Sequence, residues 1–368
     1  MALPQVKVDA TKDRLDSMAL PEGGAWVTAA RQDALSRLTA TGLPHKRDEY
    51  WRYTDPALLA ASDVATSEAL RTDTPIFGET DKVRLIFVDG VFDASESDDL
   101  TLAGVEITRL ADAQAVDVHW AQGLYGKLEA EGQNPVDRPL AILNTAFATD
   151  GVCVHVTGKA AKPLHISYRQ SSDASDVALH HVIKVDAGAE LTLLETGTPG
   201  ARSNVVLEAD IADGATLHHV RPQGRAHNRA VATHVFARVG AEATLKSFTL
   251  AMNGKLTRNE IVANIVGDDA VVHVGGACVG DGTNFHHDDT VFITHDALRG
   301  ESRQVFKKVL RNGATGVFQG KILVKVGAQK TDGYQISQSL LLDDDSQFLA
   351  KPELEIYADD VILSLIHI

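Results

Sequence analysis

The run FHHDD at residues 285–289 gathers the residue types best suited to bind a metal ion. It places two imidazoles beside two carboxylates, with His295 nearby, and such ligands together suit zinc or iron. In a strand, however, neighbouring side chains point to opposite faces, so His286 and His287 cannot readily bind one ion. A metal site would need alternate residues, such as His286 with Asp288, and otherwise we expect polar sheet positions here.

Cys278 lies in the small-residue run GGACVGDG and is a further candidate for a metal site. A thiolate at this position would accept sulfur or iron, whereas a buried thiol would pack like a small apolar side chain. Cys153 is the only other cysteine, so the sequence has no disulfide framework and no CxxC zinc spacing. Two isolated cysteines favour a reducing compartment, and we expect a cytoplasmic protein.

Two runs rich in glycine and glutamine, at residues 311–321 and 327–335, superficially resemble phosphate-binding loops. A Walker A loop needs G-x4-G-K-[ST], but Lys321 is followed by Ile322 and no glycine directly precedes Lys330. The sequence also lacks a GxSxG elbow, an HExxH helix and a GxGxxG turn in a βαβ setting. We therefore expect no ATPase activity and no catalytic residues.

The composition excludes two classes of partner. The formal net charge is −15, whereas nucleic-acid binding needs clustered Lys and Arg, so we expect no nucleic acid. The longest apolar run, VILSLIHI, is far shorter than the roughly 20 residues of a membrane span, so we expect no membrane. Aromatic residues make up only 5% of the chain, so Val, Ile, Leu and Ala must supply most of the core.

Residues 1–149 indicate a mixed, partly helical region that precedes the repeats. The first expected element is a helix with Trp26, Ala30, Ala34 and Leu38 on one face, which ends at Gly42 and Pro44. A hairpin over 83–92 follows and turns at Asp89-Gly90. We then expect a helix with Trp120, Leu124 and Leu128 on one face, and a short helix over 140–147. Between the first two lies the aromatic run HKRDEYWRYTDP, which we expect to pack onto the body rather than bind a partner.

From residue 150 to 361 short apolar strands alternate with turns, and one pattern repeats. Its central glycines are spaced 26, 26 and 27 residues apart, at Gly188, Gly214, Gly240 and Gly267. A fixed period of this size indicates a solenoid whose coils each hold two strands, with glycines at equivalent corners. Stacked coils bury the apolar strand face that no coil can bury alone. An immunoglobulin-like sandwich would not explain the period, and the period does not define the handedness.

The most specific blocks lie after residue 284 and resemble the SufB/SufD family. They are SRQVFK (302–307), GVFQGKI (316–322), AQKTDGYQ (328–335), LLL (340–342) and KPELEIYADDV (351–361). EYWRYTD (49–55) resembles the N-terminal motif of SufD members and favours that branch. The resemblance implies a mainly β protein with a right-handed parallel β-helix, flanked by helical terminal regions.

The resemblance also implies a role and partners. Family members form a complex in which SufB and SufD pair side by side and the SufC ATPase is docked. That complex builds a nascent iron–sulfur cluster from sulfur brought by sulfur-transfer partners, and flavin has been associated with it. We therefore expect a non-catalytic scaffold subunit without an intrinsic cofactor, whose SufB-facing surface lies near residues 330–361.

The family pattern breaks off after Val361. Family members continue with a Cys-Ser-His-Gly motif and a C-terminal helical region, whereas this sequence reads ILSLIHI over residues 362–368. We interpret these residues as a tail outside the family pattern and the chain as C-terminally truncated, with its helical end missing. No cluster-linked family residue can be carried over, because His367 is out of register.

Two other functions compete with the scaffold hypothesis. A β-helix carbohydrate-active enzyme would need clustered carboxylates and aromatic sugar platforms, but Trp26, Trp51 and Trp120 all precede the solenoid. A histidine-rich metal-binding protein would use the candidates named above, His286, His287, Asp288 and Cys278. That hypothesis requires the imidazoles of His286 and His287 to converge on one ion, whereas we expect one to point inward and the other outward.

Overall fold

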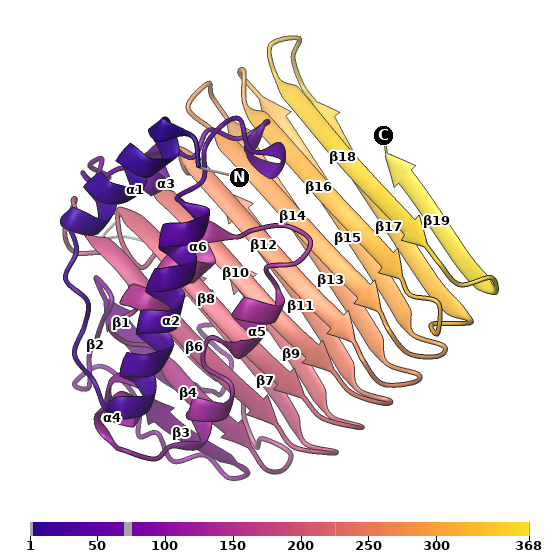
Figure 1. The fold of residues 1–368 in the computed structure, drawn as a ribbon, viewed down its shortest axis with the longest axis horizontal. Helices are drawn as coiled ribbons and strands as arrows, with labels where there is room; N and C mark the ends of the chain where they lie inside the picture. The colour runs from indigo at the N-terminus through magenta and orange to yellow at the C-terminus, as the bar shows by residue number, and fades with distance from the viewer. Residues whose placement is uncertain (1–2, 70–75, 225, 368) are drawn as a thin grey trace.

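The computed structural model describes residues 3–69, 76–224 and 226–367. The chain winds through about 7 turns of a parallel β-solenoid built from two sheets, with a partly helical N-terminal region (Figure 1). Each coil adds one strand to each sheet, so strands two apart in the sequence are parallel neighbours. The mainly β solenoid predicted from the glycine period is confirmed.

The ten-stranded sheet runs in the order β19-β17-β15-β13-β11-β9-β7-β5-β1-β2. Its strands are β1 (Val83–Val88), β2 (Val91–Phe92), β5 (Leu164–Arg169), β7 (Glu190–Gly197), β9 (Thr216–Pro222), β11 (Thr244–Met252), β13 (Val271–Asp281), β15 (Glu301–Arg311), β17 (Thr331–Leu341) and β19 (Val361–His367). The nine-stranded sheet holds β3 (Val105–Arg109), β4 (Val152–Val156), β6 (Asp176–Val185), β8 (Arg202–Ile211), β10 (Ala230–Val239), β12 (Leu256–Ile265), β14 (His286–His295), β16 (Thr315–Val324) and β18 (Gln347–Ile356).

The core lies between the two sheets and follows from strand alternation. Val235, Ala237 and Val239 of β10 point inward into one cluster with the equivalent residues of neighbouring coils. The register of β10 on β12 aligns Val235 with Ile261, so similar side chains stack from coil to coil. Branched aliphatic residues pack well in an interior between two pleated sheets. Their packing compensates for the low aromatic content.

The four repeat glycines lie in the turns that lead from the nine-stranded to the ten-stranded sheet, as expected: Gly188, Gly214, Gly240 and Gly267. Their positions within those turns differ. Gly188 and Gly214 occupy the left-handed corner, with φ of 71° and 67°. In the next two turns Glu242 and Asp269 hold that corner, with φ of 56° and 59°, and the glycine comes two residues earlier. The predicted equivalence is therefore wrong for the second pair, because insertions lengthen the later coils.

The helices pack against the nine-stranded sheet (Figure 1). They are α1 (Gln5–Asp16), α2 (Ala25–Thr41), α3 (Ala57–Ala60), α4 (Leu110–Ala115), α5 (Lys127–Glu131) and α6 (Pro139–Phe147), with 3₁₀ turns η1 (Glu49–Trp51) and η2 (Trp120–Gly123). Helix α6 contacts β6 and β8, and α2 lies on α6. Within the described residues, no helix is long and apolar enough to cross a membrane.

The local predictions for this region hold with one exception. Helix α2 ends at Gly42 with φ of 69°, and the hairpin of β1 and β2 turns at Asp89-Gly90 with positive φ at both residues. The single helix expected over Trp120 to Leu128 is wrong. Gly126 adopts a left-handed conformation that separates η2 from α5, because a positive φ cannot continue a right-handed helix.

The two ends of the solenoid differ. At the N-terminal end, β1 and β3 come from before residue 150 and join the two sheets beside β5 and β4. At the C-terminal end, β18 and β19 are the outermost strands of their sheets. Residues 361–367 form β19, which pairs in parallel with β17, so they continue the coil.

Candidate functional site

The predicted metal residues lie on β14, and the strand separates them into two sets. His287 is 1% exposed and lies beside Lys308 inside the solenoid, whereas His286 contacts Thr54 of the N-terminal region outside it. The expected division of the histidine pair is therefore confirmed. Asp288 lies on the outer side with His286, and Asp289 on the inner side with His287.

The outer set forms a buried network under the N-terminal region. The carboxylate of Asp288 accepts hydrogen bonds from Thr54 Oγ1 at 2.6 Å and from Gln319 Nε2 at 3.1 Å. Arg258 Nη1 lies 2.5 Å from the same carboxylate and 2.9 Å from the carbonyl oxygen of Tyr50. The network thus joins β12, β14 and β16 to the segment around η1.

The aromatic motif EYWRYTD is held by the same coils. The Arg258 guanidinium lies 4.0 Å from the centroid of the Trp51 ring, a cation–π contact. Tyr50 donates a 2.6 Å hydrogen bond to Glu353 of β18, and the Lys351 ammonium lies 3.8 Å from the Tyr50 ring centroid. The motif therefore packs onto the solenoid body, as the sequence predicted.

The inner set is an ion pair with a neutral imidazole beside it. Lys308 Nζ lies 2.5 Å from Asp289 Oδ2 and 2.8 Å from Nδ1 of His287. Burial alone would lower the pKa of Lys308, but the charge of Asp289 raises it above the ordinary value. Burial and the Lys308 charge hold the pKa of His287 well below its usual range. Lys308 is therefore charged, and the His287 imidazole accepts its hydrogen bond.

Cys278 lies inside the solenoid on β13 and is 2% exposed. Burial raises the pKa of its thiol to about 12, with nearby Lys308 opposing the shift. Cys153 is also buried, and burial raises the pKa of its thiol too. At neutral pH both cysteines are thiols, which are poor nucleophiles and poor metal ligands.

The candidate metal ligands do not come together around one point. Across residues 3–69, 76–224 and 226–367, no three His, Cys, Asp or Glu side chains are grouped so that they could hold a metal ion. His286 and Asp288 do share the outer face, but Thr54 contacts both of them and Arg258 pairs with the aspartate. In the structure this pair anchors the N-terminal region.

Sequence reasoning missed the residues that organise both sets, Arg258 and Lys308. The signal was present in β15, where Ser302, Gln304 and Lys308 alternate with residues that face outward. Alternation placed these side chains on one face, but their polarity hid the fact that this face is the interior. A run of alternate polar residues inside a repeat could have indicated an interior polar network.

The C-terminal end of the solenoid is a second candidate site, because it exposes large apolar side chains. They are Leu340, Leu341, Leu342, Leu354, Ile356, Tyr357, Ile362 and Leu365, and Ile362 is 73% exposed. Within the described part of the chain, β18 and β19 each pair with a strand on one side only. Exposed apolar patches are typical of surfaces that bind another polypeptide.

The fold and these sites define a parallel β-solenoid protein whose motif residues anchor an N-terminal helical region and whose β18–β19 coil exposes apolar side chains. Comparison with protein families is consistent with that class. The SufBD core domain of the SUF system for FeS cluster assembly matches residues 168–365, more than half of the chain, and the SufBD N-terminal region matches residues 18–166. The chain belongs to the SufBD family.

Curated relatives cover most of the chain at modest identity. The iron-sulfur cluster assembly SufBD family protein slr0076 of Synechocystis is 25% identical, over 97% of this chain and 83% of its own length. The iron-sulfur cluster assembly protein SufD of Escherichia coli is 26% identical, over 90% of this chain and 77% of its own length. Protein ABCI7 of Arabidopsis thaliana, a chloroplastic protein, is 24% identical, over 93% of this chain and 75% of its own length.

Proposed function

We propose that this protein is a non-catalytic scaffold subunit of a cytoplasmic SufBCD complex, which pairs with SufB and docks the SufC ATPase. The relative in Escherichia coli carries the name SufD, and the family model assigns the core to iron–sulfur cluster assembly. In this proposal the nascent cluster is cargo of the assembled complex. No step in the proposal requires a flavin or a resident metal ion on this chain.

The C-terminal end of the solenoid is the observation that supports the pairing with SufB. Tyr357 and Ile362 expose apolar area on this part of the solenoid. Burying such area against a second polypeptide is favourable, and a SufB solenoid with a similar apolar coil would bury it.

The proposed interface has a direct test in co-purification. The chain would be co-expressed with SufB and SufC, and the recovery of both partners measured for the wild type and for Tyr357→Asp/Ile362→Asp. Burying two new carboxylates in an apolar contact is costly, so we expect the variant to lose most of its SufB. Recovery of SufC with the wild type tests whether the ATPase docks on this chain.

The matched control is Val91→Asp/Val118→Asp, which places the same two charges on exposed valines of the N-terminal region. It should retain SufB at the wild-type level, and circular dichroism should show equal β content in all three proteins. Equal SufB recovery with both double variants would place the interface elsewhere and refute this assignment.

A further inference from the structure

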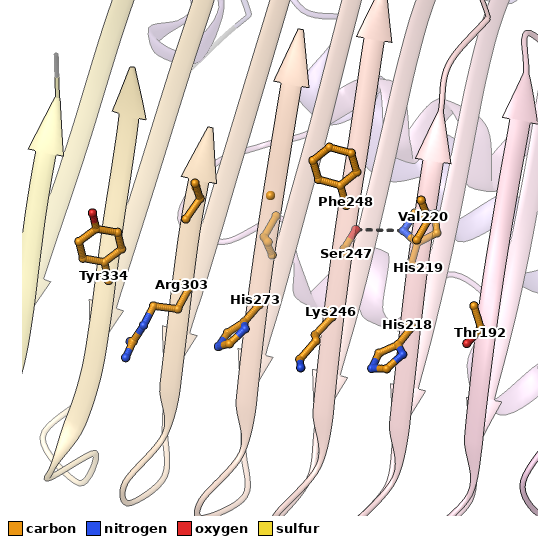
Figure 2. A pocket seen from close by; sticks show the side chains of 13 residues that line it. Thr192, His218, His219, Val220, Lys246, Ser247, Phe248, His273, Arg303 and Tyr334 are labelled. Carbon is orange, nitrogen blue, oxygen red and sulfur yellow. Dashed lines mark hydrogen bonds between the residues drawn. The ribbon is translucent and has the colours of Figure 1, made fainter. Parts of the chain in front are cut away.

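The outer face of the ten-stranded sheet carries an open hollow of about 800 Å³. The helices do not cover this face, since they pack on the other sheet (Figure 1). The strands are in register, so one row of side chains crosses the hollow at the same height, as Figure 2 shows. This row consists of Thr192, His218, Lys246, His273, Arg303 and Tyr334.

A second, apolar row lies two residues further along each strand. Val220, Phe248, Gly275 and Val305 form this row on β9, β11, β13 and β15. Phe248 is 43% exposed, although it is a large aromatic side chain. Gly275 lets the Phe248 ring lie close to the backbone of β13, because an added Cβ would come 3.3 Å from that ring. The floor of the hollow is thus apolar.

The unpaired positive charge of the hollow lies on β11, beside His218 of β9. Glu301 binds His273 at 2.8 Å and Asp332 binds Arg303 at 2.7 Å, so acidic neighbours already engage that half of the row. Among the described residues, the Lys246 ammonium has no acidic partner and the His218 ring no hydrogen-bond partner. On a chain with net charge −15, an unpaired lysine beside exposed apolar residues indicates an acidic and apolar ligand.

The shape of the hollow favours a polypeptide over a small molecule. Small-molecule sites typically bury 70–90% of the ligand, whereas an open sheet face contacts a ligand from one side only. The apolar row crosses four strands, or about 14 Å at the usual strand spacing of about 4.8 Å. Three turns of a helix advance about 16 Å, whereas three same-face steps of an extended strand advance about 20 Å. The spacing therefore matches a helix better than a strand.

We propose that this hollow docks an amphipathic helix of a partner protein, with acidic side chains over His218 and Lys246 and apolar side chains against Phe248 and Val305. The nine-stranded sheet of the same chain already binds helices on its outer face. This surface is centred on β9 to β15 and its proposed ligand is not SufB, so the inference goes beyond the proposed function and is tested without SufB.

The probe is a synthetic 18-residue helical peptide with one glutamate per turn along one stripe and leucines along the next. Its affinity for the full 368-residue chain would be measured by fluorescence anisotropy, beside a peptide with lysine in place of each glutamate. We expect the glutamate peptide to bind at least tenfold more tightly. Lys246→Glu should reverse that preference, and Phe248→Ser should weaken binding of the glutamate peptide at least tenfold.

The matched control is Lys255→Glu, which reverses an exposed lysine outside the hollow and should leave both affinities unchanged. Equal binding of the two peptides, or no effect of Lys246→Glu, would overturn the proposal. Tighter binding of an extended peptide with alternating Glu and Leu would overturn the proposal that the ligand is helical. Self-association of the chain that Phe248→Ser abolishes would show that a second copy occupies the hollow instead.

Discussion

The hydroxyl of Thr54 donates a 2.6 Å hydrogen bond to the carboxylate of Asp288, although 234 residues separate them in the chain. Asp288 is fully buried and also pairs with Arg258, which in turn contacts the Tyr50 carbonyl. One carboxylate therefore ties the N-terminal motif of the family to the block after residue 284. The metal-like run FHHDD is in this respect a docking point for the N-terminal region.

Replacing Asp288 by alanine should destabilise the protein strongly. The change leaves the buried Arg258 with one carboxylate partner fewer, and breaking a buried pair costs about 3–5 kcal/mol. Asp296→Ala is the matched control directly after the same strand, since its pair with Lys325 is exposed and such pairs are worth about 0–1 kcal/mol. Urea denaturation gives both free energies of unfolding, and equal losses would contradict the anchoring role.

The buried pair of Lys308 and Asp289 should behave as a unit. Lys308→Met leaves the Asp289 carboxylate buried without its cation, and we expect a loss of about 3 kcal/mol. Adding Asp289→Asn removes the unpaired charge and should restore part of the stability. A double-mutant cycle measured by urea denaturation should give a coupling of at least about 1 kcal/mol. Strictly additive losses would show that the two groups do not interact.

Cys278 should resist alkylation in the folded protein. Its thiol is buried and has a pKa raised to about 12, so the reactive thiolate is scarce at neutral pH. We expect iodoacetamide at pH 7.5 to label Cys278 slowly in buffer and rapidly in denaturing urea, as followed by peptide mass spectrometry. Cys153 provides an internal comparison, since it is buried too. Fast labelling of Cys278 alone in the native protein would reveal an activated thiol.

Mild acid should destabilise the fold through buried histidines. Burial lowers the pKa of His181 from 6.5 to about 4, and its Nδ1 accepts a hydrogen bond from the backbone N–H of Val152. The unfolded chain therefore binds more protons than the folded chain between pH 6.5 and 4, so stability falls as pH falls through that window. Each such histidine lowers the free energy of unfolding by roughly 1–3 kcal/mol by pH 4.

The measurement is the free energy of unfolding between pH 7 and 5, a range above the ordinary pKa of carboxylates. His181→Gln should lower stability at pH 7 but flatten the pH dependence, because it removes one titrating group. His165, His234 and His295 also have pKa values lowered to about 4, mainly by burial, and will retain part of the slope. A constant free energy of unfolding across this range would disprove the linkage.

The strand periodicity determined more of this protein than any single motif. The alternation and the glycine period predicted a solenoid with two strands per coil, and the opposite facing of His286 and His287. These predictions succeed because side-chain direction in a strand has a period of two whatever the rest of the chain does. The same local logic found the end of α2 at Gly42 and the hairpin turn at Asp89.

Tertiary structure decided which face is buried and which residues meet. Lys307 and Lys308 had to point apart, but only the neighbouring coil, with Asp289 and His287, made Lys308 the buried one. The row of His218 and Lys246 likewise depends on register between coils. Contacts across coils depend on the summed lengths of all intervening turns and strands. Small changes in turn length, such as those that displace Gly240 from the left-handed corner, shift that sum, so local pattern alone could not define it.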